Sequence, residues 1–420
     1  MNHSRMRSFL QIAGPGLLIA ATGVGAGDLA GGAFAGSKLG TAVLWAVLAG
    51  AFLKYVVTEG LARWQLATGE TLLEGAIHRL GVPVQILFLG YLLVWSYWVG
   101  SALISACGVA GTAFFPALNP QFGKIIFGVL HSLAGLALVW RGNYDRFERV
   151  MSVGVGLMFT AVIVTALRVM PQDFSFLKGL IPSVPVYVNS AGSNQGPVWT
   201  LALMGGVGGT LTVLSYGYWI REKGRSTASD LKTCRLDLLF AYGVTALFGM
   251  AMVVIASQTD LDKQASARLV VVLADRLGET LGASGRLVFL VGAWAAIFSS
   301  LLGVWQAVPY LFADFWRLSR NQKNRSDIVN VHSKPYRLYL LALTFIPMVG
   351  LGYKFVAAQK AYAVLGSLVI PSLAVLLLVL NGRKAWVGAQ RNRPLTTVVL
   401  VAIVLLFLYI GGPSLLAVFK

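Results

Sequence analysis

A glycine-rich break divides the first long apolar stretch of the chain and constrains its fold more than any other feature. The stretch runs from about Phe9 to Gly40, which is long enough to cross a bilayer, and Gly23-Val24-Gly25-Ala26-Gly27-Asp28 interrupts it. Unpaired backbone groups are tolerated at membrane depth only where they face protein or a water-filled cavity. A carboxylate within a span is costly unless it has a partner or a function. The break therefore predicts a discontinuous membrane helix with a polar site at Asp28.

A second break lies in the other half of the chain. Gly205-Gly206-Val207-Gly208-Gly209-Thr210 interrupts another apolar stretch, and four glycines within five positions exceed what a helix-packing seam requires. Two broken helices at matching positions of two halves indicate the binding site of a secondary transporter.

The composition excludes a soluble protein and several classes of site. Apolar residues make up 57% of the 420, and charged residues only 12%, against roughly a quarter in soluble domains. The net charge of +18 is spread over short loops, so nucleic-acid binding is not expected. Two cysteines and four scattered histidines indicate no disulfide framework and no zinc site. We expect neither a cofactor nor an enzyme, because no catalytic constellation lies within the spans.

Runs of about 20 apolar residues predict an all-α membrane protein with eleven transmembrane helices. Lys and Arg outside these spans favour one side by roughly two to one, which predicts a multi-pass protein of the cell membrane with a cytoplasmic N-terminus. Five spans separate the breaks, so we expect one domain, 1–420, built as a five-plus-five inverted repeat. Repeat one covers about 10–169, repeat two about 195–381, and an extra helix about 395–418. The predicted spans are 10–37, 40–62, 83–113, 122–141, 148–169, 195–220, 232–257, 285–312, 337–356, 361–381 and 395–418.

Asp28 is the acidic residue that we place deep within a span. One interpretation is that it caps the second half-helix, whose amides favour a carboxylate. The other is that it faces a central cavity as a cation ligand or proton carrier. The two interpretations are compatible, and the second is favoured. Lys54 and Glu59, in the second span, are interpreted as a pair separated by about one and a half turns.

Other polar groups complete the expected site. Thr210 and the glycine backbone of the second break are candidate ligands. In the eighth span, Ser299 and Ser300 are candidates for a coupling-ion site, although serine hydroxyls commonly bond to their own preceding turn. Gln306 is expected to face the interior, where it would line a pathway.

Gly14-Pro15-Gly16, followed by Gly25-Ala26-Gly27-Asp28-Leu29, is similar to the GPG and Asp-Pro-Gly-Asn-Leu elements of the Nramp superfamily of divalent-metal transporters. The resemblance implies that family's LeuT-like fold with two broken helices. Residues 60–72 resemble its Ala-Arg…Thr-Gly…Leu pattern, and Ala296-Ile297-Phe298-Ser299-Ser300 its Ser-Ser element. The matches occur in the family's order over most of the chain.

The resemblance implies an altered site. Gly25 and Asp28 stand where the family has its metal-ligating Asp and Asn, and Ala26 replaces the Pro. Gly208 and Thr210 stand in place of a metal-ligating Met and a His. The loss of a soft thioether removes a preference for manganese and iron, whereas a carboxylate with hydroxyls and carbonyls suits a hard cation.

Two functions remain open from the sequence. The first is alternating-access transport of a cation, a divalent metal by default, with metal ligands Asp28 and Thr210. Gly23, Gly25, Ala26, Gly205 and Gly208 would complete the substrate site, with a proton or sodium as the coupling ion. The second is ion-coupled transport of a small organic solute such as an amino acid. The lipid bilayer is the other expected partner.

Overall fold

The computed structural model describes residue 16 and residues 25–141, 144–170, 175–188, 192–259, 269–320 and 329–418. These residues are almost entirely helical, as predicted, and the β pairing among them is an isolated bridge between Val188 and Asn194. The longer helices are α3 (Ala26–Leu39), α4 (Leu44–Thr68), α6 (Val82–Thr112), α7 (Pro120–Trp140), α8 (Tyr144–Val169), α9 (Gly196–Gly206), α11 (Leu231–Ser257), α12 (Leu269–Ser319), α13 (Lys334–Phe345), α14 (Phe355–Ser367), α15 (Val369–Leu380) and α17 (Pro394–Val418).

Each predicted span has a helical counterpart among these elements. Eight runs within the described residues are long and apolar enough to cross a membrane, and a bent pair ending in α17 makes nine. One of the eight, Gly27–Thr68, is 42 residues long and joins α3 to α4, whereas a single crossing needs about 20. Counted as two crossings, this run brings the total to ten, and α8, whose apolar stretch Phe159–Val169 is shorter than a full span, would be the eleventh. The count of eleven is thus consistent with the helices but remains a prediction.

The second break has the form that its glycines predict. Helix α9 ends at Gly206, and the chain then runs through the non-helical residues 207–210. Gly208 and Gly209 have positive φ angles of 74° and 85°, which residues with a side chain rarely adopt. A 3₁₀ turn, η3 (Leu211–Leu214), and helix α10 (Ser215–Glu222) follow, so the sixth span is two half-helices around an irregular segment.

The first break is described from its second half. Helix α3 begins at Ala26 after Gly25, whose conformation is not helical. Gly23 and Val24 lie outside the described residues. The start of the second half-helix agrees with the expected position of the break.

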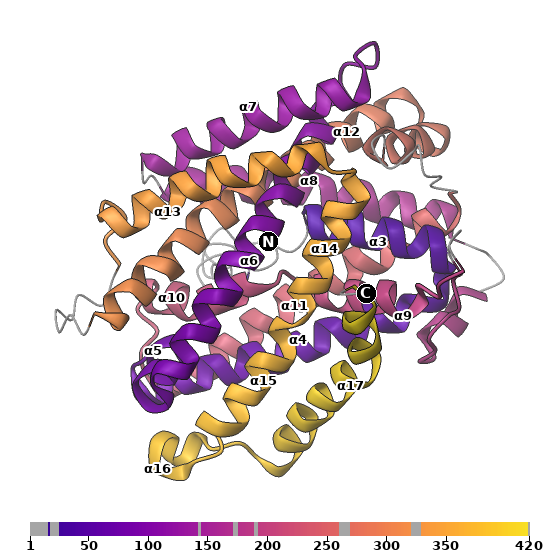
Figure 1. Ribbon diagram of the computed structural model, residues 1–420. Helices are drawn as coiled ribbons and strands as arrows, with labels where there is room; N and C mark the ends of the chain where they lie inside the picture. The colour runs from indigo at the N-terminus through magenta and orange to yellow at the C-terminus, as the bar shows by residue number, and fades with distance from the viewer. Residues whose placement is uncertain are drawn as a thin grey trace, which may run out of the picture.

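Two seams in the centre of the molecule bring helix backbones together without intervening side chains. A methyl group at Gly36 of α3 would lie 2.6 Å from the Val253 carbonyl oxygen of α11. At Gly50 of α4, it would lie 2.7 Å from the Met204 carbonyl oxygen of α9. Helix α17, by contrast, lies at one edge of the molecule beside α15 (Figure 1). Helices α3 and α9, which flank the two breaks, are therefore each packed backbone to backbone against a neighbouring helix.

Charged side chains gather where several helices end. Glu74 belongs to the short helix α5 (Leu72–Leu80) and pairs with Arg221 at 2.9 Å, near the end of α10. Arg317, near the end of α12, contacts the same carboxylate at 2.8 Å and Asp314 at 2.7 Å. This ion network joins the ends of the second, sixth and eighth spans, which the alternating topology predicts to lie on one side.

Candidate functional site

Asp28 joins the first broken helix to the second break. It lies in the first turn of α3, with only 1% of its surface exposed. One carboxylate oxygen, Oδ2, accepts a hydrogen bond from the Gly208 amide at 3.3 Å. The other, Oδ1, is buried and has no hydrogen-bond partner among the described residues. Gly25, not Asp28, is the N-cap of α3, so the carboxylate reaches across to the other half of the chain.

The Lys54 ammonium is hydrogen-bonded to carbonyl groups of the second break. Lys54 lies in the middle of α4, with 2% of its surface exposed. Its ammonium donates to the carbonyl oxygen of Gly205 at 2.7 Å and, in still shorter contacts, to those of Val207 and Gly209. An ammonium has three N–H donors, so these acceptors satisfy all of them.

The irregular segment thus separates two opposite charges. Its Gly208 amide faces the Asp28 carboxylate, while the flanking carbonyls face the Lys54 ammonium. The two side chains interact electrostatically, although they form no direct ion pair. In a low-dielectric interior, each charge compensates part of the cost of burying the other.

The tenth span closes the site from another side. Thr210 packs against Gly366 of α14, and Tyr362 of the same helix lies close enough to Asp28 to interact with it electrostatically. A methyl group at Gly27 would lie 3.4 Å from the Tyr362 hydroxyl oxygen. Thr210 itself is 2% exposed. Asp28, Lys54, Thr210 and Tyr362, from four different spans, therefore form one occluded cluster.

Known proteins place this chain in a family and a fold. Residues 16–417 match the family model described as natural resistance-associated macrophage protein-like, Nramp. The chain belongs to the Nramp family. It is 26% identical over 425 residues to the divalent metal cation transporter MntH of Chromohalobacter salexigens, covering 97% of this chain and 92% of that protein.

Solved structures show the same fold. A mutant of the Eremococcus coleocola manganese transporter has a TM-score of 0.74 at 15% identity, covering 99% of this chain and 88% of that chain. MhsT in complex with L-phenylalanine has a TM-score of 0.61 at 16% identity, covering 94% and 97%. At these identities the likeness is one of fold. It confirms that this Nramp-family chain has the LeuT-like architecture with two broken helices.

Some of the other predicted site residues lie beside the breaks, and others do not. Gly25 lies against Ser300 of α12, so closely that a side chain at residue 25 would overlap the serine hydroxyl. Ser299 donates to the Ala296 carbonyl at 2.8 Å, the local bond that serine commonly makes in helices. Gln306 instead lines a small pocket with Tyr218 and other residues at the end of the sixth span. Of the three polar residues predicted in the eighth span, Ser300 is the one whose side chain contacts the first break.

One interpretation from the sequence is wrong. Glu59 pairs with Arg63 at 2.8 Å and with Arg235 at 2.7 Å, and Lys54 points to the second break instead. Residues five apart differ by about 140° around a helix, whereas Glu59 and Arg63, four apart, share a face. Lys54 and Tyr362 are the site residues that sequence analysis missed, and only the cost of an intramembrane lysine could have indicated the first.

The ligand chemistry around Asp28 is oxygen-rich. No group of three or more His, Cys, Asp or Glu side chains suited to a metal occurs within the described part of this Nramp-family chain. The available ligands are one carboxylate, backbone carbonyls and the Thr210 hydroxyl. Such a set suits a hard cation that keeps part of its water shell.

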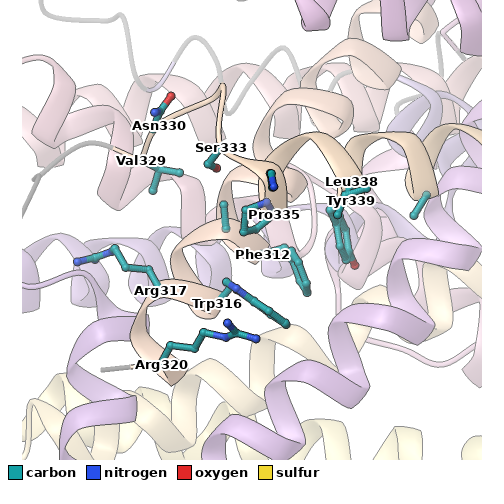
Figure 2. A pocket seen from close by; sticks show the side chains of 13 residues that line it. Phe312, Trp316, Arg317, Arg320, Val329, Asn330, Ser333, Pro335, Leu338 and Tyr339 are labelled. Carbon is teal, nitrogen blue, oxygen red and sulfur yellow. The ribbon is translucent and has the colours of Figure 1, made fainter. Parts of the chain in front are cut away.

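A larger cavity lies elsewhere. It measures about 870 Å³ and is bounded by the end of α12 and the start of α13. Figure 2 shows its aromatic wall of Phe312, Trp316 and Tyr339, with Arg317 and Arg320 also lining it. No residue of the Asp28 cluster lines this cavity, so its size does not make it the candidate transport site.

Proposed function

We propose that this chain is a secondary transporter that carries a divalent metal cation across the membrane by alternating access. Membership of the Nramp family supports this function. So does the match, over almost the full length of both chains, to a divalent metal cation transporter. The observation that carries the proposal is the Asp28 carboxylate. It is buried where the two broken helices meet, and one of its oxygens has no hydrogen-bond partner in the described part of the chain.

Each residue of the proposed metal site has a physical role. Asp28 supplies the negative charge, and Thr210 supplies a hydroxyl oxygen. The carbonyls of the second break, at Gly205 and along the irregular segment, supply neutral oxygen ligands. Gly25 and Ser300 bring the first helix and the eighth span together beside it. Because this set contains no sulfur, we expect Mg²⁺ to bind about as well as Mn²⁺.

The transporter would lie in the cell membrane with its N-terminus in the cytoplasm. In that orientation, the ion network of Glu74, Arg221 and Arg317 faces the cytoplasm. A proton or sodium ion would serve as the coupling ion. We assign the chain no enzymatic activity, in keeping with the transporters to which it is related.

The test is metal uptake by the full-length protein in liposomes that contain a metal-sensitive fluorophore. Wild type and Asp28→Asn are compared with Mn²⁺ and with Mg²⁺, and Asp275→Asn, which alters an exposed ion pair, is the matched control. We expect uptake by wild type and the control, and an apparent affinity of Asp28→Asn at least roughly a hundredfold lower, which is about 2.7 kcal/mol. Failure of the well-folded wild type to move or bind either ion would contradict the proposal.

A further inference from the structure

Lys54 is held in the way that proteins hold a small cation. Three carbonyl oxygens, from Gly205, Val207 and Gly209, surround its ammonium, and the Asp28 carboxylate lies on the other side of the same segment. Oxygen ligands from an irregular backbone, with a nearby carboxylate, are also what a hard metal ion requires. The carbonyl groups of the second break therefore already bind a cation, the ammonium group of Lys54.

A metal ion and the Lys54 ammonium cannot share these groups. Lys54 is 2% exposed, Thr210 2% and Asp28 1%, so the cluster leaves almost no surface open to even a water molecule. A divalent ion against the ammonium would also be repelled, and strongly so in a medium of low dielectric constant. Binding of a metal to the carbonyls requires the ammonium to leave them.

The side chain of Lys54 is able to move away. It is a flexible four-carbon stem that carries a point charge. One turn along α4, the hydroxyl of Thr58 lies 2.7 Å from the Tyr242 hydroxyl, and Thr58 also donates to the Lys54 carbonyl. Because residues four apart share a helix face, this hydroxyl pair offers acceptor atoms within reach of the lysine.

We propose that Lys54 is a tethered cation that competes with the transported metal for the carbonyls of the second break. The inference rests on the proposed function and names a determinant of its affinity. In the metal-free protein, Lys54 neutralises Asp28 and closes the site. Metal binds as the ammonium withdraws, so removal of the Lys54 charge leaves the carbonyls and Asp28 free for the metal.

The experiment is isothermal titration of purified full-length protein with Mn²⁺ and, separately, Mg²⁺. Wild type is compared with Lys54→Met, Lys54→Gln and Lys54→Arg. Glutamine keeps an N–H donor for the carbonyls and guards against loss of folding, and arginine keeps the charge. We expect Met and Gln to raise the affinity at least about tenfold, because a tethered competitor acts at a millimolar or higher effective concentration. Arginine should leave affinity at or below that of wild type.

The possible outcomes separate the inference from the proposed function. A merely structural role for Lys54 would make the neutral variants bind more weakly. Unchanged or weaker binding by folded Lys54→Met and Lys54→Gln, with binding retained by wild type, would overturn the inference alone. If neither wild type nor any folded Lys54 variant binds either ion, the proposed function fails and the inference fails with it.

Discussion

The mutual dependence of Asp28 and Lys54 can be tested through stability. We compare Asp28→Asn, Lys54→Met and the double variant in the absence of metal. Two unit charges just beyond direct contact attract by about 3 kcal/mol at an effective dielectric constant of about 20. Removal of one partner leaves the other buried without its countercharge, which commonly costs about 3–5 kcal/mol. The double variant leaves no uncompensated charge, so its loss should be smaller than the sum of the single losses by about 3 kcal/mol.

The assay is the midpoint of thermal unfolding in detergent. For a chain of this size, 1 kcal/mol corresponds to a shift on the order of 1–2 °C, by extension from smaller domains. The double variant should therefore unfold about 3–6 °C above the midpoint that additive losses would give. Asp275→Asn is the control, since its pair with Arg286 is exposed and such pairs contribute little. Additive losses within error would refute the claim that the two charges stabilise each other.

Three further predictions concern packing, pH and thiol reactivity. Gly25→Ala should destabilise by about 1–3 kcal/mol in thermal unfolding, because its methyl group would overlap the opposing serine. Gly31→Ala, on the same helix with open space around it, should be neutral or stabilising. Burial alone would raise the pKa of Glu74, but hydrogen bonds from the Arg221 side chain and the Thr71 amide, with nearby positive charges, lower it below the ordinary 4.5. The stability that Glu74 contributes is thus present above pH 4.5 and lost as the pH falls further. Glu74→Gln should abolish this acid-side loss, and a thermal midpoint that still falls with the same pH profile would contradict it. Both cysteines are buried, so a maleimide should label them only after denaturation, as mass spectrometry would show; rapid labelling of the native protein would count against their burial.

The fold was accessible from the sequence because its signals are local. Apolar runs of membrane length mark the helices, and the glycines of the second break both remove side chains and permit the positive φ angles of Gly208 and Gly209. Asp28 stood out for a similar reason, as a carboxylate in an apolar run. These features depend only on neighbouring residues, so a single sequence reveals them.

The composition of the site was less accessible because it depends on distant contacts. Lys54 meets carbonyls that lie 151 to 155 positions further along the chain, and no periodicity connects them. Glu59, the nearest acidic residue in the same helix, suggested instead that Lys54 forms a local ion pair. Tyr362 had no signal either, since a tyrosine in an apolar span more often packs than binds. Metal binding by the predicted ligands remains a prediction.

The backbone seams at Gly36 and Gly50 determine where this molecule can bend. An interface made by main-chain atoms has no rotamers to rearrange, so it resists sliding in small steps. The seams join α3 to α11 and α4 to α9, and α11 also packs against α4, so we expect these four helices to move together. We therefore expect bending at the irregular residues 207–210, which interrupt the sixth span. These residues also hold the Asp28 and Lys54 side chains, so a change of occupant there should also change the bending stiffness.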